Sequence, residues 1–161
     1  MSSKTSAIYQ MLVSHQDAEP PSRKGPELKF RCIEGQFAIC RLPADNPVPG
    51  WATKGIFTSI TRTSDELSVV CPLENVPEQH KPDVPWICFK LEGPFAFSQT
   101  GILHAFIEPL AENGVPILAI ATFDTDYVLV QESFIGVSLD SLQRAGHEMV
   151  PKDDSGRKFI E

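Results

Sequence analysis

Short apolar runs separated by turn-forming residues divide the first half of this chain into predicted strands. Residues 28–42, LKFRCIEGQFAICRL, alternate apolar and polar positions around Glu34 and Gly35, a pattern that predicts a β-hairpin. Residues 55–71, GIFTSITRTSDELSVVC, predict a second strand, turn and strand. We therefore expect two consecutive antiparallel strand pairs in this part of the molecule.

The next segment changes from strand spacing to helical spacing. WICFKLEG predicts a strand, and the following SQTGILHAFIEPLAENG carries apolar residues on one helical face, at Ile102, Leu103, Phe106, Ile107 and Leu110. This spacing predicts a helix at about 101–113. Ser98 or Thr100 can cap its start, and Asn113 with Gly114 supplies the left-handed residue that ends it.

Two apolar strands and a second helix follow. VPILAIATF (115–123) and DYVLVQE (126–132) predict strands that are too apolar to be solvated on both faces. SFIGVSLDSLQRAG (133–146) predicts a helix that stops at its last glycine, and HEMV (147–150) predicts a short final strand. The second half therefore has the order β-α-β-β-α-β.

An internal repeat relates the two halves. FTSITRTSDELSVV (57–70) aligns with ILAIATFDTDYVLV (117–130), and AICRL (38–42) is similar to ICFKL (87–91). Between the matched strands the first half has only PADNPVPGWATKGI, whereas the second half has a full helix. The repeat predicts two copies of one βαββ-type unit, the first with an abbreviated crossover. One copy cannot cover both faces of its sheet, so the two must pack together or against another subunit.

Composition sets the boundaries of these units. Residues 1–26 are polar and rich in proline, which predicts a flexible arm with a short helix around 8–13. The first unit is then expected at 27–84 and the second at 85–150, with a polar tail at 151–161.

Charge and hydropathy narrow the class of partner. The 161 residues are 42% apolar, enough for one compact unit with a core, and carry a net charge of −7. This acidity argues against binding to nucleic acid or to an anionic membrane surface, because both require clustered Lys and Arg. No apolar run approaches the ~20 residues of a membrane span, and MSSKTSAIYQMLVS lacks the apolar stretch of a secretory signal. We expect a cytoplasmic protein.

Residues that bear catalytic or metal chemistry are sparse. The four cysteines form no C-x-x-C pair and the four histidines are scattered singly, so neither a zinc site nor a cofactor is predicted. Buried thiols are a better interpretation of the cysteines than disulfides. No phosphate-binding or nucleophile motif is present, and His104 with Glu108 is typical of a solvated helix face. A hydrolase that uses Asp124 or Asp126 is the weakest alternative, so we expect no enzyme activity.

Several segments together are similar to a known family. They are CRLPADNPVPGW, FTSITRTSDELSVVCP, LEGPFAFSQTGILHAFIEPLAENGVPILAIATFDTDYVLV and LQRAGHE. This set resembles the small tandem ACT-like proteins, a group that includes the cytosolic arginine sensors of the TOR pathway, over about residues 28–150. The resemblance implies an α+β fold of ferredoxin-like βαββαβ units in tandem. It also implies a non-enzymatic regulatory function in binding small molecules, typically amino acids, without a cofactor.

The resemblance also implies a ligand site, formed by the loop before the helix and the turn after the following strand. Carried onto this sequence, the site residues are Thr100, Gly101, Ile102, Thr122, Phe123 and Asp126. Amides at a helix start suit an α-carboxylate, and a carboxylate such as Asp126 suits an ammonium or a cationic side chain. The alternatives are that Gly101 only permits the strand-to-helix turn and that Asp126 only caps backbone amides.

Differences from the family leave two functions open. The arginine sensors have four ACT units and this chain has two, so the site is expected to require a homodimer. At the repeat spacing of 60, the first half has Arg62, Thr63 and Glu66 opposite the second-half residues Thr122, Phe123 and Asp126, a degraded copy for binding. The leading hypothesis is an amino-acid-binding regulatory module. Its rival is a ligand-free protein for dimerisation or docking within a regulatory complex.

Overall fold

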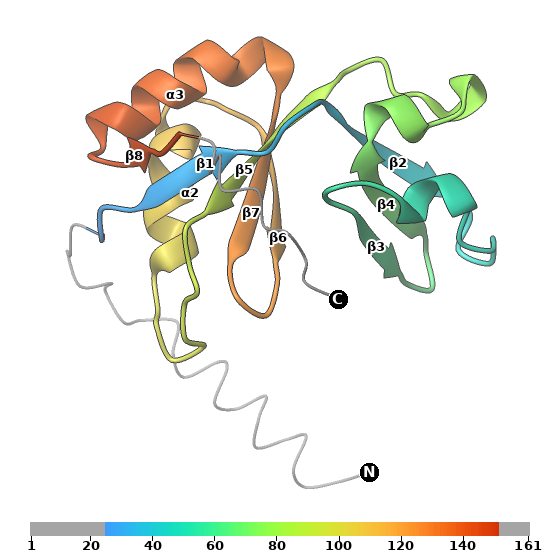
Figure 1. Cartoon of the computed structure of the whole chain (residues 1–161), viewed down its shortest axis with the longest axis horizontal. Helices are drawn as coiled ribbons and strands as arrows, with labels where there is room; N and C mark the ends of the chain where they lie inside the picture. Colours follow the sequence, from blue (N-terminus) through green and yellow to red (C-terminus); the bar gives the residue numbers. More distant parts are fainter. Residues whose placement is uncertain (1–24, 152–161) are drawn as a thin grey trace, which may run out of the picture.

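The computed structural model describes residues 25–151, which form an eight-stranded mixed sheet with two α-helices (Figure 1). The predicted arm helix at 8–13 and almost all of the predicted tail lie outside the described residues. The strands are β1 (Lys29–Cys32), β2 (Phe37–Leu42), β3 (Ser59–Arg62), β4 (Leu67–Pro72), β5 (Trp86–Leu91), β6 (Ile117–Ala121), β7 (Asp126–Gln131) and β8 (Glu148–Met149). The helices are α2 (Ile102–Glu112) and α3 (Ile135–Arg144). Short 3-10 turns are η1 (Gly50–Thr53), η2 (Leu73–Asn75), η3 (Glu78–His80) and η4 (Glu132–Phe134).

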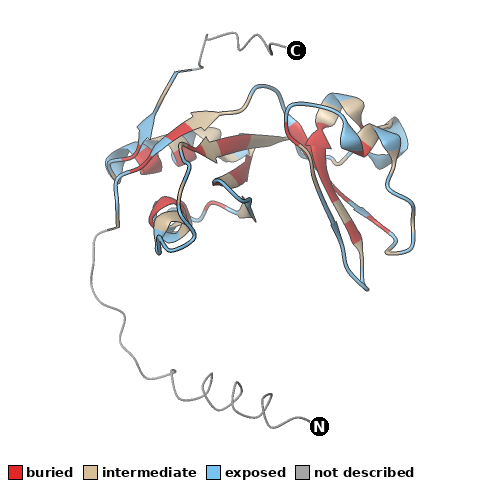
Figure 2. Cartoon of the chain, turned by 60° about the horizontal axis from the view of Figure 1, so that its bottom comes forward, coloured by how far each residue is buried: buried red, intermediate tan, exposed pale blue. Residues whose placement is uncertain are grey.

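The second half has the predicted order β5-α2-β6-β7-α3-β8. β7 lies between β5 and β6 and is antiparallel to both. The two helices cover one face of this sheet and share a core with it. Buried positions are coloured red along the ribbon in Figure 2. Its fully buried members include Phe89, Phe106, Leu110, Val128 and Leu142. The fold class is therefore α+β and ferredoxin-like, as predicted.

The ends of α2 agree only partly with the sequence. Its C-terminus lies at Asn113, and Gly114 has the expected left-handed conformation with φ 69°. The expected cap at the start is wrong, because Gly101 with φ 78° takes the N-cap position and no side chain bonds to the first turn. The chain enters the helix through the left-handed conformation of Gly101. Ser98 and Thr100 precede the N-cap position, and neither side chain caps the helix.

A buried histidine repairs a defect inside α2. Pro109 has no N–H, so the carbonyl of Ala105 lacks the donor that the fourth following residue normally supplies. His147 Nε2 lies 2.9 Å from this carbonyl oxygen, and Leu28 N–H donates to Nδ1 at 3.0 Å. Because Nδ1 accepts a hydrogen bond, the ring proton is on Nε2, which donates to Ala105. His147 therefore joins the N-terminal strand, α2 and β8.

The predicted hairpin of residues 28–42 is wrong. β1 pairs antiparallel with β5 and parallel with β8, and Ile33 N–H extends the ladder to Cys88 O at 2.8 Å. The reason is burial: Phe30 is only 2% exposed, with its ring centroid 5.3 Å from that of Phe89 and 5.2 Å from that of Phe106. An isolated two-stranded hairpin offers no such core.

The first half contributes three strands, β3-β4-β2, to one end of the eight-stranded sheet, and the predicted hairpin at 55–71 forms there. Its pairing repeats that of the second half. Phe37 opposite Pro72 corresponds to Trp86 opposite Gln131, and Arg62 opposite Leu67 corresponds to Ala121 opposite Asp126. Matching hairpin positions are thus 59 residues apart (121 − 62 and 126 − 67), one fewer than the spacing of 60 expected from the sequence. Only η1 replaces the helix, as the abbreviated crossover predicts.

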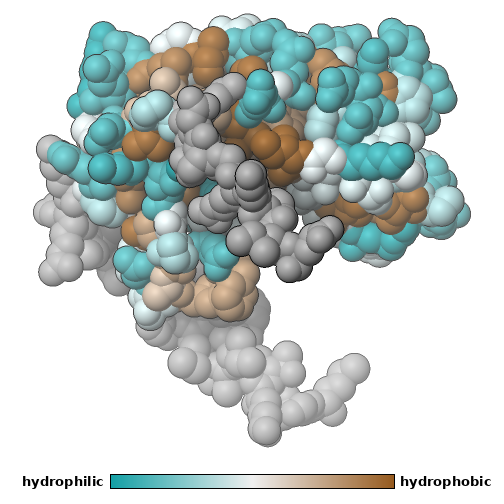
Figure 3. Space-filling view, in the orientation of Figure 1, coloured by the Kyte–Doolittle hydropathy of each residue, from teal (hydrophilic) through white to brown (hydrophobic). Residues whose placement is uncertain are grey.

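The helix-free sides of the two halves contact each other. A third core cluster contains Phe37, Phe57, Val70, Cys88 and Leu129. Phe57 stacks on Tyr127 from the other half, with ring centroids 4.4 Å apart. Apolar atoms accordingly appear in the middle of the molecule, between the halves, in Figure 3. This contact explains why the strand YVLV is apolar on both faces.

Candidate functional site

The loop between β5 and α2 and the turn between β6 and β7 project in the same direction, toward the lower side of Figure 1. Together they line a small pocket of about 140 Å³. From the loop and helix come Phe95, Ala96, Phe97, Gln99 and Ile102, and from the hairpin come residues 121–126. The two segments selected in the sequence therefore lie on opposite walls of one pocket.

Backbone contacts fix these two walls to each other. Phe95 N–H donates to Asp124 O at 2.8 Å, and the Thr125 hydroxyl, buried at 6% exposure, donates to Leu91 O at 2.8 Å. Gly93 permits this approach, since a Cβ there would lie 2.9 Å from Asp124 O. The pocket is thus held by the strand-end backbone rather than by side chains alone.

The turn itself is held by its threonines. Thr122 N–H donates to Thr125 O at 2.9 Å, and the Thr122 hydroxyl donates to the same oxygen at 2.7 Å. Thr125 N–H lies 3.4 Å from the Thr122 hydroxyl oxygen. Thr122 lines the pocket, but its hydroxyl proton stabilises the turn.

Two exposed aromatic rings form the rim. Phe97 is 77% exposed and Phe123 is 79% exposed, with ring centroids 5.1 Å apart at an interplanar angle of 88°. Large apolar side chains gain nothing in stability from such exposure. A pair of phenyl rings beside a pocket suits the aliphatic stem or the cationic group of a ligand.

Asp126 differs from its neighbour Asp124. It is the first residue of β7, pairs with Ala121 and is half-buried, and burial raises the pKa of its carboxyl group. Within residues 25–151, no hydrogen bond or ion pair engages this carboxylate. Asp124 lies in the exposed turn and contributes its backbone oxygen to Phe95. The carboxylate of Asp126 is therefore a half-buried polar group of the pocket that lacks a described partner.

The start of α2 contributes less than expected. Ile102 lines the pocket, whereas Thr100 and Gly101 do not belong to its lining. Gly101 is required by its positive φ, and a Cβ there would meet no atom within 4 Å. The need for a left-handed residue at the strand-to-helix turn is thus sufficient to explain Gly101. The space beside this glycine is open.

Comparison with known proteins identifies the fold family. A model of the ACT domain matches residues 83–144, and a model of a separate N-terminal domain matches residues 35–79. Residues 83–144 of this chain therefore belong to the ACT-domain family. The ACT match covers the whole segment that forms β5, α2, β6, β7 and α3, including both walls of the pocket.

Individual relatives are consistent with this assignment. The bovine (Bos taurus) cytosolic arginine sensor for mTORC1 subunit 1 is 28% identical over 123 residues, which cover 64% of this chain. The chain spans only 37% of the length of that relative. A solved protein from Agrobacterium tumefaciens is 44% identical, covers 78% of this chain and 93% of its own, and has a TM-score of 0.73. Aspartate kinase of Clostridium acetobutylicum, at 12% identity and TM-score 0.50, covers 81% of this chain and 36% of its own and shares the fold alone.

The loop residues that line this pocket were not identified from the sequence. Phe95, Phe97 and Gln99 line the pocket, and Gln99 Oε1 accepts a hydrogen bond from Ala96 N–H at 2.8 Å. The signal was present in the segment GPFAFSQTG, where two aromatic residues stand in a loop of otherwise small and polar residues. Aromatic residues in such a loop indicate a surface used for contact.

The site contains no catalytic or metal-binding constellation. No group of three or more metal-ligating side chains occurs within residues 25–151, and His104 with Glu108 forms an exposed helix pair at 3.8 Å. The four cysteines are free thiols, and burial raises the pKa of Cys71 to about 11, well outside the range of a reactive thiolate. Among the described helices, none has the length and hydropathy to cross a membrane.

Proposed function

We propose that this ACT protein is a non-enzymatic regulatory module that binds an amino acid between the β5–α2 loop and the β6–β7 turn. The proposal rests on the observation that two separate segments of the sequence meet at one pocket. Ile102, Thr122, Phe123 and Asp126, selected from two separate segments, line one pocket with a half-buried carboxylate. In this arrangement Asp126 receives a positive group of the ligand, the first amides of α2 lie near its carboxylate, and the phenyl rim contacts its stem.

The size of the pocket supports a second proposal, a homodimer. At about 140 Å³ the pocket is smaller than the ~300–1,000 Å³ typical of ligand sites. The exposed rings of Phe97 and Phe123 stand where a further wall is missing. A second copy of the chain would supply that wall. Light scattering at micromolar concentration is expected to give twice the monomer mass in the presence of ligand, and a monomer under all conditions would contradict the dimer.

The first half is proposed to be a reduced ACT-like unit at 27–84, beside the second unit at 85–150. The matching registers of β2-β4-β3 and β5-β7-β6 support this division. Two pairings cross this division: β1 pairs with β5 and β8, and Phe37 of β2 pairs with Trp86 of β5. A cytoplasmic location is proposed because the related arginine sensor is a cytosolic protein.

A panel of the twenty amino acids in a thermal-shift assay tests the ligand. L-Arginine is the first member, because the curated relatives are named as arginine sensors. A ligand at ~100 times its Kd should stabilise the native state by about 2.7 kcal/mol, because only the folded protein binds. Asp126→Asn is expected to abolish the shift.

Asp124→Asn is the matched control and is expected to retain the shift, since its carboxylate lies in the exposed turn. If no amino acid raises the Tm of the wild-type protein, whether monomer or dimer, the rival interpretation of a ligand-free docking protein is favoured. If Asp126→Asn binds as well as the wild-type protein, the site assignment is wrong.

A further inference from the structure

The first half of the molecule has a counterpart of the pocket, a space between a strand-end loop and a hairpin, and there a side chain of the protein fills it. There, the loop after β2 faces the end of β3, as the loop after β5 faces the end of β6. The guanidinium group of Arg62 bridges this gap, donating hydrogen bonds to Ala44 O and, at 2.8 Å, to Asn46 O. A side chain of the protein thus joins the two walls that enclose a pocket in the second half.

Hydrogen-bond register makes the comparison residue by residue. Arg62 opposite Leu67 corresponds to Ala121 opposite Asp126, with a turn of four residues between the members of each pair. The turns share their closing bond, since Thr63 N–H donates to Glu66 O at 2.9 Å, just as Thr122 N–H donates to Thr125 O. The corresponding positions are therefore fixed by backbone pairing and do not depend on similarity of side chains.

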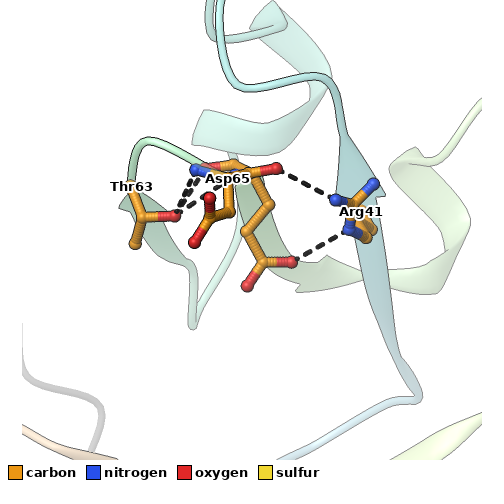
Figure 4. A network of polar contacts seen from close by, with 4 residues as sticks. Arg41, Thr63 and Asp65 are labelled. Carbon is orange, nitrogen blue, oxygen red and sulfur yellow. Dashed lines mark hydrogen bonds and ion pairs between the residues drawn. The ribbon is translucent and has the colours of Figure 1, made fainter.

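A second arginine further closes the first-half turn. Arg41 donates to Asp65 O at 2.9 Å, and its Nε lies 3.3 Å from the carboxylate of Glu66 (Figure 4). In the second half the strand position of Arg41 is taken by Lys90, and that of Glu66 by Thr125, whose hydroxyl is bonded to Leu91 O. Arg41 thus contacts the first-half turn, whereas Arg62 bonds to the loop after β2.

The exchange of two residues converts a filled gap into a pocket. In the first half, a long cationic side chain accompanies Leu67, which is fully buried. In the second half, the small side chain of Ala121 accompanies the half-buried carboxylate of Asp126, and both line the pocket. Directly opposed residues on antiparallel strands project from the same face of the sheet, so the missing side chain would have lain beside that carboxylate.

We infer that Ala121 opens the ligand pocket, and that the cationic group of the ligand takes the place that the Arg62 guanidinium takes in the first half. The chain accordingly has one such site, because its own arginine fills the counterpart. The ligand part of this inference rests on the proposed function, whereas the role of Ala121 concerns the geometry of the protein alone. Ala121 acts as a specificity-determining residue through the space that it leaves.

The test returns a cationic side chain to the second half. In Ala121→Arg, the new guanidinium is expected to reach Asp126 and the loop carbonyls, raising Tm by about 2–4 °C relative to Ala121→Gln. This gain should vanish when Asp126→Asn is added to both variants, a double-mutant cycle that needs no ligand. Equal Tm values for the arginine and glutamine variants, or a gain that persists with Asp126→Asn, would overturn the inference.

Binding measurements separate this inference from the proposed function. With L-arginine or any other amino acid that shifts the wild-type protein as the probe, both Ala121→Arg and Ala121→Gln should weaken binding at least tenfold, because each fills the pocket. Ala119→Gln, an exposed position two residues earlier on the same face of β6, is the control and should bind within twofold. Undiminished binding in the Ala121 variants would refute the inference and leave the proposed function intact. If Ala121→Arg gives an Asp126-dependent gain in Tm but no amino acid binds the wild-type protein, the role of Ala121 is supported and the proposed function is refuted.

Discussion

The contact between His147 and the Pro109-containing helix gives a quantitative test of the fold. Leucine in place of His147 fills a similar volume with an apolar side chain and removes both ring nitrogens. Leu28 N–H and Ala105 O are then left in a buried region without the partners that lie 3.0 and 2.9 Å away. Each unpaired buried group costs about 1–3 kcal/mol, so we expect His147→Leu, which leaves two such groups, to lower the free energy of unfolding by about 2–6 kcal/mol.

A second substitution isolates the part of this cost that arises from the helix. Pro109→Ala restores an N–H four residues after Ala105, which can then donate to the Ala105 carbonyl oxygen within the helix. In this background, the loss of His147 leaves only Leu28 N–H unpaired. The cost of His147→Leu should therefore fall by about 1–2 kcal/mol, whatever Pro109→Ala does to stability by itself.

Urea denaturation of the four proteins measures the coupling, with circular dichroism and fluorescence transitions compared to establish two-state unfolding. The m-value should remain constant, because the substitutions do not change the area exposed on unfolding. An equal cost of His147→Leu in both backgrounds, within ~0.3 kcal/mol, would show that His147 does not replace the missing helical donor. A cost below ~1 kcal/mol in the wild-type background would refute the buried-bond argument altogether.

Three further predictions concern the core, the turn and the pocket. Phe106→Ala should cost about 3–5 kcal/mol in urea denaturation, because this ring is fully buried against Phe30 and Phe89. Thr125→Val, which keeps the shape but removes the donor to Leu91 O, should cost about 1–3 kcal/mol and weaken amino-acid binding, measured by calorimetry. Burial raises the pKa of Asp126, so its contribution to stability is present below the unfolded pKa and is lost as pH rises through the folded pKa. Asp126→Asn should remove this acid-side change in Tm, and an unchanged pH profile would contradict it.

Periodicity predicted most elements correctly, whereas strand partners required the tertiary structure. The apolar spacing of 101–113 is a local property of the chain, and α2 forms over nearly the same residues. The choice of β1 between β2 and β5 is not local, because it depends on where Phe30 finds a core. That core is assembled from residues more than fifty positions further along the chain.

The repeat spacing was one residue too long for a related reason. Apolar runs such as LSVVC and DYVLV can be shifted by one position and still match in hydropathy. The turns cannot, because Thr63 and Thr122 must each close the same hydrogen bond. The T-x-D pattern shared by TSDE and TFDT therefore carried the correct register. At that register the counterpart of Asp126 is Leu67 rather than Glu66.

This corrected register changes the physical interpretation of Asp126. A turn-capping carboxylate should accept bonds from backbone amides, but the threonines hold this turn, and within residues 25–151 no amide donates to Asp126. The position is filled by a fully buried leucine in the first half, so the fold itself favours an apolar side chain there. An ionised carboxylate at the same place is partly desolvated, and no described side chain of opposite charge compensates for it. Such a residue lowers stability unless a cation arrives, and this cost supports the proposal that Asp126 binds a positive group of a ligand.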